Sequence, residues 1–200
     1  MGGPRGGPPP ALIGHLEQRL GAMTGGRSIP GLPAGPPISV ARFTGGELEG
    51  SVSYATIGLS NRPLRSGQSG KDLYLELIAS EYDGPESDDR LSACLEAIAK
   101  RLAIRSSPLL RGNVIRLDGP LRPGSLMTGF YAAIPVYFDD AFKSVHVEDG
   151  RHVAIVWLLP VGPSEIDFIE QYGYAEFEAE LIKTNPDLYD LNRSEVTFRA

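Results

Sequence analysis

The stretch VAIVWLLPVGPSEIDFIEQYGYAEFEAEL, residues 153 to 181, decides the fold. Val153 to Leu159 is apolar at both alternating sets of positions, so a strand formed there has two covered faces and lies inside a sheet with helices packed on it. Ser164 and Asp167 form an S-x-x-D capping pattern, and Gly173 is placed to end a helix in a left-handed conformation. The stretch therefore predicts a central strand followed by a helix.

Upstream patterns predict one long helix and several more strands. The helix covers Arg90 to Leu102, where Asp88 and Asp89 favour its start and Cys94 lies in its apolar stripe as a packing residue. Apolar runs separated by Gly, Ser and Asn clusters predict strands at residues 38–43, 51–57, 73–78, 113–117 and 130–138. Strands outnumber crossover helices, so the predicted fold class is α+β, a mixed, largely antiparallel sheet with helices packed on it.

The chain's three histidines are the first candidates for metal binding or acid-base chemistry. Asp149-Gly150 predicts a two-residue hairpin turn, a register that pairs Val147 with His152. Directly paired residues share a face, so His146 is expected to point away from His152. His15 lies in a separate predicted helix. We therefore expect no metal site and no cofactor.

Residues 1 to 37 are rich in Gly and Pro and are predicted to form a leader and linker outside the core. Leu12, Leu16 and Leu20 recur every four residues there, which predicts one short amphipathic helix over Ala11 to Met23, beginning after Pro10. This helix either docks on its own domain or recruits a partner. The domain itself is expected to span residues 38 to 200, with little contribution to stability from the leader.

The bulk composition excludes several classes of protein. With 19 basic and 25 acidic residues the formal net charge is −6, which disfavours non-specific attraction to nucleic acid. Cys94 is the single cysteine, which excludes an intramolecular disulfide and suits a reducing cytosol. The longest apolar run is far below the ~20 residues that span a bilayer. We expect a cytoplasmic protein that has no membrane segment and no secretory signal.

Ser60 is the candidate nucleophile that the sequence offers. It follows a strand and has Gly58 two residues before it, as in a hydrolase G-x-S-x-G turn, but Arg62 stands where the second Gly belongs. A turn serine bonded to nearby backbone is the favoured interpretation, and a hydrolase using Ser60 is the third-ranked alternative. No complete nucleophile or acid-base constellation appears, so we expect no catalytic residues and no enzyme activity.

Several pieces, taken in order, resemble the suppressor-of-fused-like domain family from about residue 38 to residue 193. The pieces are YATIGLS (54–60), LYLELIA (73–79), AIAKRLA (97–103), RGNVIRLDGPLRPGSLMTGF (111–130) and the block that begins at Val153 and ends in LNR (191–193). Each piece is short, and their shared order makes the resemblance specific.

The resemblance implies a non-enzymatic protein-binding domain and three contact residues. Bacterial members look like immunity proteins of toxin systems, whereas the animal branch sequesters a transcription factor by pairing with an extended peptide. In that branch a strand that opens with Gly-Asp supplies a carboxylate, and Gly112 and Asn113 are the matching positions. Arg101 and Leu109 lie near the corresponding aromatic contacts. The implied partner-binding residues are therefore Arg101, Leu109 and Asn113.

The resemblance leaves two functions open. The first is a cytosolic immunity protein that binds and neutralises a cognate toxin domain. The second is an intracellular regulatory adaptor that sequesters an unrelated protein partner. The sequence does not identify the partner or the oligomeric state.

Overall fold

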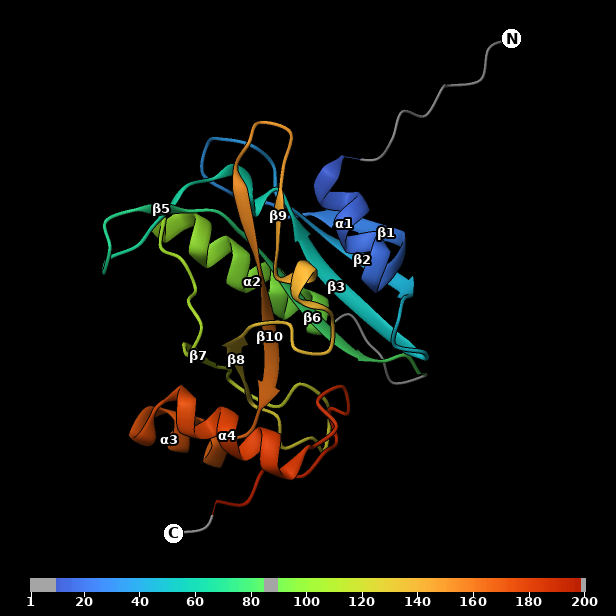
Figure 1. Cartoon of the computed structure of the whole chain (residues 1–200), viewed down its shortest axis with the longest axis vertical. Helices are drawn as coiled ribbons and strands as arrows, with labels where there is room; N and C mark the ends of the chain where they lie inside the picture. Colours follow the sequence, from blue (N-terminus) through green and yellow to red (C-terminus); the bar gives the residue numbers. More distant parts are fainter. Residues whose placement is uncertain (1–9, 85–89, 199–200) are drawn as a thin grey trace.

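A computed structural model describes residues 10–84 and 90–198 (Figure 1). The main sheet has eight strands in the order β1-β2-β3-β6-β10-β8-β7, and β9 also pairs with β10. These strands are β1 (Gly21–Ser28), β2 (Ser39–Gly45), β3 (Ser51–Ile57), β6 (Leu75–Tyr82), β7 (Val114–Arg116), β8 (Gly129–Ala133), β9 (Ser144–His146) and β10 (His152–Val161). A separate two-stranded sheet joins β4 (Leu64–Arg65) to β5 (Asp72–Leu73).

Four α-helices accompany the sheet in the described part of the chain. They are α1 (Ala11–Leu20), α2 (Arg90–Arg105), α3 (Pro163–Tyr172) and α4 (Tyr174–Thr184), with two short 3-10 helices, η1 (Leu59–Asn61) and η2 (Asp140–Lys143). None of the helices over these residues is long and apolar enough to cross a membrane. Asp88 and Asp89, which were expected to favour the start of α2, lie outside the described residues.

β10 runs through the middle of the sheet (Figure 1), and its side chains from Ile155 to Val161 are buried on both faces, as its sequence predicts. It pairs in parallel with β6 and antiparallel with β8. Val156 and Leu158 belong to one core cluster, and Ile155, Trp157 and Leu159 belong to the other. Alternate residues of β10 therefore pack into separate cores on the two sides of the sheet. A mixed sheet with helices packed on it is the predicted α+β fold class, which is confirmed.

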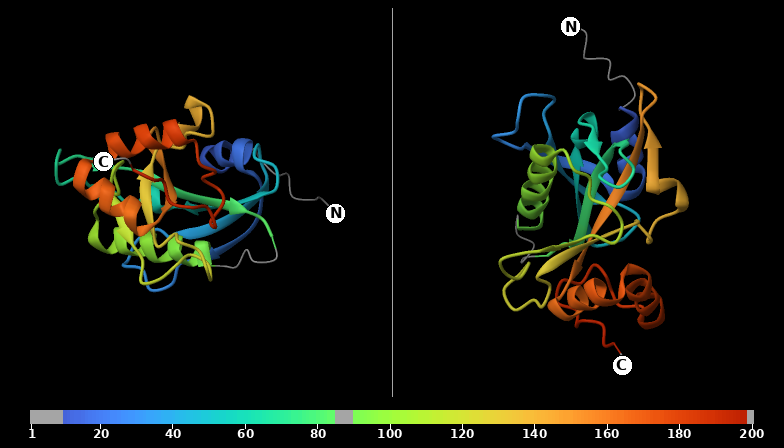
Figure 2. Two further views of the ribbon diagram at one scale, coloured as in Figure 1. Left: turned by 90° about the horizontal axis from the view of Figure 1, so that it is seen from below. Right: turned by 90° about the vertical axis from the view of Figure 1, so that its left-hand side faces the viewer.

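Helices on opposite sides of the sheet close these two cores (Figure 2). α2 buries Leu91, Leu95 and Ile98 in the same cluster as Leu158 of β10. α1 packs on the other face, and α3 and α4 lie beyond the carboxyl end of β10. The apolar stripe predicted for residues 90–102 is thus the face of α2 that covers the sheet.

The prediction that the Gly/Pro-rich leader lies outside the core is wrong for α1 and Ile29, whereas residues 30–37 are mostly exposed and form no helix or strand. Leu12, Leu16 and Leu20 are at most 8% exposed and share a core cluster with Phe43 of β2. Residues 21–23, expected to end the helix, and residues 24–28, expected to be linker, form β1 and pair with β2, with an irregularity at Thr24. β1 is an edge strand with mostly exposed side chains, so backbone hydrogen bonds to β2 can fix it without apolar side chains.

The helix predicted around the three leucines is confirmed, and it docks on its own domain. Gly21 joins α1 to β1 at a φ of +85°, where an added Cβ would lie 2.2 Å from the Thr44 carbonyl oxygen. This connection therefore requires glycine. Residues 1–9 lie outside the described ranges, and a domain boundary at residue 38 stays a prediction.

The register predicted for the β9–β10 hairpin is wrong by one residue. His146 pairs directly with His152, and the Val147 N–H donates to the Arg151 carbonyl at 3.0 Å. Three residues therefore form the loop, with Gly150 at a φ of +80°. A one-residue shift turns a side chain to the other face, so the two histidines lie together, with ring centroids 4.8 Å apart. The described residues hold no group of three or more metal-ligating side chains.

Other element boundaries differ from their predictions for local reasons. β8 ends at Ala133, two residues before Pro135, whereas the predicted strand ran to residue 138. The strand predicted over residues 73–78 is interrupted at Tyr74, which separates β5 from β6. Gly173 ends α3 with φ +92° and ψ 165°, which is not left-handed helical, and α4 begins at the next residue.

Leu16→Ala is expected to lower the free energy of unfolding by about 2–5 kcal/mol, because it leaves a cavity at a fully buried position. Chemical denaturation measures this difference. Gln18→Ala, an exposed position of the same helix, is the matched control and is expected to change stability little. Equal, small effects of the two variants would mean that α1 is dispensable for the core, as the sequence alone suggested.

Candidate functional site

β7 is the last strand of the main sheet and has a strand neighbour on one side, β8. The Asn113 carbonyl and the Leu117 N–H make hydrogen bonds toward β8. Because successive residues of an antiparallel strand alternate in direction, the backbone groups of Val114 and Arg116 turn away from β8. These groups have no hydrogen-bond partner among the described residues. The edge thus offers donors and acceptors to an added strand.

A hollow of about 420 Å³ lies beside this edge, between α2 and β7. Ala93 and Ala97 of α2 line it, and their small side chains leave room next to Ile115 of β7. Arg101, one turn further along α2, lines the same hollow and is exposed. The edge of β7 and the hollow therefore form one surface, which we call the β7 surface.

The three residues predicted to contact a partner do not have equal access to it. Arg101 lines the β7 surface, and Asn113 is exposed immediately before β7. Leu109 is 6% exposed and belongs to the core cluster under α2, so it presents almost no surface. The Asn113 side-chain oxygen accepts a hydrogen bond from the Leu110 N–H at 2.8 Å, which closes the turn into β7. The contact roles of all three residues stay predictions.

A polar network that the sequence did not reveal holds the start of β7 against α4. The Arg111 guanidinium and the Tyr131 hydroxyl both donate to the Glu178 carboxylate. Arg111 also lies over the Tyr174 ring, 5.2 Å from its centroid. Burial and the bond to Glu178 raise the pKa of Tyr131. Gly112, at a φ of +94°, passes so close to Tyr174 that an added Cβ would lie 2.7 Å from the ring.

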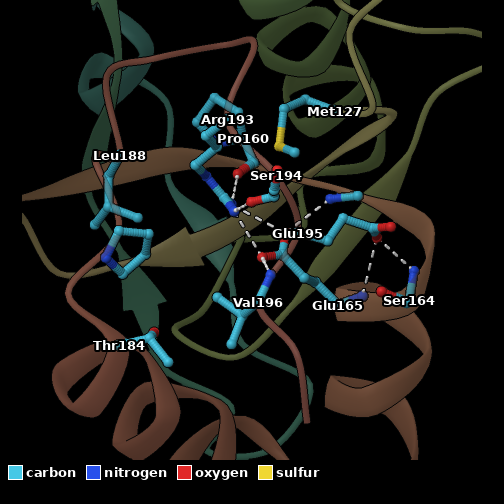
Figure 3. A network of polar contacts seen from close by, with 12 residues as sticks. Met127, Pro160, Ser164, Glu165, Thr184, Leu188, Arg193, Ser194, Glu195 and Val196 are labelled. Atoms are coloured by element: carbon cyan, nitrogen blue, oxygen red, sulfur yellow. Dashed lines mark hydrogen bonds and ion pairs between the residues drawn. The ribbon is translucent and has the colours of Figure 1, made fainter.

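A buried ion pair ties the C-terminal segment to the end of β10 (Figure 3). Arg193 donates to both oxygens of Glu165, at 2.7 and 2.9 Å, and to the Pro160 carbonyl at 2.9 Å. Glu165 is fully buried and also accepts from the N–H groups of Gly162 and Val196, both at 2.9 Å. This set of bonds gives Arg193, the last residue of the family-like block, a structural role.

The S-x-x-D cap predicted for the start of α3 is wrong. The residue before the helix is Gly162, and its N–H donates to the Glu165 side chain. Asp167 instead binds Arg116 of β7 at 2.7 Å. The Glu165 carboxylate, at the third helical position, therefore caps the helix in place of the predicted pattern. Asp167 instead connects α3 to β7.

Ser60 has a structural position in this fold. It is 3% exposed, and its hydroxyl donates to Glu76 at 2.7 Å. Glu76 is fully buried and also accepts from the Thr56 hydroxyl at 2.6 Å and the Gly58 N–H at 2.9 Å. Burial raises the pKa of Glu76, and these hydrogen bonds act in the opposite direction. The Ser60 hydroxyl is thus bound to a buried carboxylate, which gives this serine a structural role in the turn after β3.

The family model described as "Suppressor of fused protein (SUFU)" matches residues 34–194. The chain belongs to the suppressor of fused family. This membership confirms the resemblance seen in the sequence. A comparison with curated proteins finds no match.

Solved structures of the family share the fold at low sequence identity. A suppressor of fused homolog from Neisseria gonorrhoeae FA 1090 matches with a TM-score of 0.68 and 16% identity, over 95% of this chain and 97% of that chain. The Sufu-Fu complex structure matches with a TM-score of 0.66 and 16% identity, over 95% and 93%. Drosophila Suppressor of Fused matches with a TM-score of 0.64 and 17% identity, over 94% of this chain and 52% of that chain.

Arg193→Met is expected to lower the free energy of unfolding by about 3–5 kcal/mol, because Glu165 would stay buried without its counter-charge. Urea denaturation measures the change. Arg116→Met, which breaks exposed ion pairs with Asp167 and Glu170, is the control and should have a much smaller effect. Adding Glu165→Gln to Arg193→Met is expected to recover part of the loss. If Arg193→Met matches the control, the ion pair does not hold the C-terminal segment.

Ser60→Ala is expected to destabilise the protein by about 1–3 kcal/mol, because it removes a donor from a buried carboxylate. Ser164→Ala, at an exposed serine, is the control for thermal unfolding. Ester, peptide and phosphoester substrates are expected to show no turnover with either variant or the parent. A hydrolysis that is lost in Ser60→Ala while the fold persists would contradict the structural role.

Proposed function

We propose that this protein is a non-enzymatic binding domain that pairs with an extended segment of a partner along β7 and neutralises a cognate toxin domain. The observation that carries the proposal is the open edge of β7, where backbone groups of Val114 and Arg116 lack partners among the described residues. Strand addition to such an edge gives affinity through main-chain hydrogen bonds. Family membership adds support, since one relative was solved as the Sufu-Fu complex.

Side chains around the edge would select the partner's sequence. Alternate residues of an added strand face opposite sides of the sheet, so one set would meet the hollow beside α2. The alanines there accept an apolar side chain, and Arg101 favours a carboxylate or a carbonyl next to it. Asn113 keeps a hydrogen-bonding group where the animal branch has a carboxylate, so the preferred partner differs in charge.

Charge and composition fit a toxin as partner. The net charge of −6 would speed encounter with a basic domain, and this attraction would weaken as salt rises. The single cysteine, Cys94, suits a reducing cytoplasm. We infer a cytoplasmic protein whose partner is a protein and not nucleic acid, membrane or cofactor.

A regulatory adaptor that sequesters another protein is the second candidate, and the same surface supports it. Co-expression separates the two: a toxin domain encoded beside this gene should kill cells alone and spare them in the presence of this protein. Rescue supports immunity. Tight binding to an unrelated regulator without rescue supports the adaptor.

Arg101→Glu and Asn113→Lys are each expected to weaken binding of the cognate partner by about tenfold or more, the effect of losing one favourable contact worth ~1.4 kcal/mol. Isothermal titration of the folded variants measures the change. Arg105→Glu, an exposed arginine of α2 outside the hollow, is the matched control. Unchanged affinity in both variants would mean that the partner contacts another face of the domain.

Val114→Pro tests strand pairing itself. Proline removes an N–H that faces away from β8, so it leaves the β7–β8 hydrogen bonds in place and blocks an added strand. Val114→Thr is the control that keeps the donor. Equal binding by the two folded variants would rule out pairing at this position.

A further inference from the structure

A second cavity lies on the face of the sheet opposite α2, away from the hollow beside β7. Its volume is about 350 Å³, which falls in the lower part of the range of small-molecule sites, roughly 300–1,000 Å³. Trp157 and Leu159 of β10 and Leu181 of α4 line it with large apolar surfaces. At its rim Ile182 is 82% exposed and Val136 is 64% exposed. An apolar group could enter from solvent and remain in contact with apolar walls.

Two acceptor side chains on the lining of this cavity, Glu178 and Tyr137, already accept hydrogen bonds. The Glu178 carboxylate accepts from the Arg111 guanidinium through two nitrogens and from the Tyr131 hydroxyl. The Tyr137 hydroxyl donates to the Pro186 carbonyl at 3.3 Å and accepts from the Leu188 N–H at 3.2 Å. For a ligand that brings hydrogen-bond donors, this leaves the exposed Asn185 amide, which donates as well as accepts.

The donors on the lining are in surplus. A guanidinium carries five N–H groups, and the described residues occupy two of those of Arg111, both with Glu178. Lys143 pairs with Asp140, whose side chain is 94% exposed and lies outside the cavity lining, so water screens this pair. The indole N–H of Trp157 is buried and has no acceptor among the described residues.

The two cations lie at one end of the cavity. Arg111 and Lys143 also line a neighbouring hollow, together with Ala133 and Ile134, so they stand where the two hollows meet. Since Glu178 neutralises one positive charge, the lining keeps a net charge of +1 in a chain whose overall charge is −6. An anionic group is therefore favoured at this end of the cavity and an apolar group along the rest.

We propose that this cavity binds a small carboxylate with an apolar body. The carboxylate accepts from Arg111 and Lys143, and the apolar body packs on Trp157, Leu159 and Leu181. The proposal is independent of partner binding along β7, because it uses other residues on the other face. A partner side chain that fills the cavity is the competing occupant.

Trp157 is the chain's single tryptophan, so its emission reports directly on the cavity. The full-length protein is titrated with decanoate, and separately with decanol and decyltrimethylammonium. We expect a saturable change in emission with decanoate and affinity at least about tenfold lower for the cation, because the free polar groups are donors. Lys143→Gln and Ile182→Glu are each expected to weaken decanoate binding by about tenfold.

Ile104→Glu, an exposed apolar position on α2 away from the cavity, is the matched control and should bind decanoate like the parent protein. Circular dichroism confirms that each variant is folded. The proposal is overturned if decanoate leaves Trp157 emission unchanged, if decyltrimethylammonium binds equally well, or if Ile182→Glu and Ile104→Glu behave alike. Binding of a protein partner that depends on Ile182, without decanoate binding, would assign the cavity to a side chain instead.

Discussion

The burial of β10 on both faces is the constraint on which the rest of the structure depends. A strand with apolar residues at every position needs a covering layer on each side: α2 lies on one side, and α1, α4 and the C-terminal segment contribute to the core on the other. β8 must then pair along one side of β10, which leaves β7 at the end of the sheet. The open edge and the alanine-lined hollow beside α2 follow from this arrangement.

Two buried carboxylates hold parts of the chain in place: one holds the turn after β3, and the other holds the C-terminal segment. Glu76 collects hydrogen bonds from the turn after β3, and Glu165 binds Arg193 after the last helix. Such buried groups cost desolvation, and full hydrogen bonding offsets that cost. Each carboxylate accepts hydrogen bonds from specific donors, so it stabilises one conformation of the turn or segment that contains them.

The sequence predicts the elements whose stability is local or strongly periodic. The strand at residues 51–57 and the apolar faces of α2 and β10 are confirmed, because their patterns alone require burial. β1 was missed because Gly-rich composition predicts linker, whereas pairing with β2 decides its structure. The hairpin register was missed because Asp149-Gly150 alone predicts a two-residue loop, whereas the loop has three residues and its Glu148 accepts from the Ala11 N–H, 137 residues away, at 2.6 Å. Arg101 was proposed as a contact residue from the family resemblance. The network around Glu178 joins the loop before β7, β8 and α4, and no sequence pattern predicts contacts between segments so far apart.

The two ends of the main sheet differ as templates for another strand. On β1 the pairing with β2 shifts between Met23 and Gly25, and such a bulge breaks the regular spacing of backbone groups along an edge. β7 is three residues long and keeps a regular pairing with β8. The irregular β1 edge is a poor template for the β7 edge of a second copy, which disfavours stacking of copies edge to edge into a continuous sheet. Under the proposed pairing, β7 then takes up a single strand, so the complex has a valency of one.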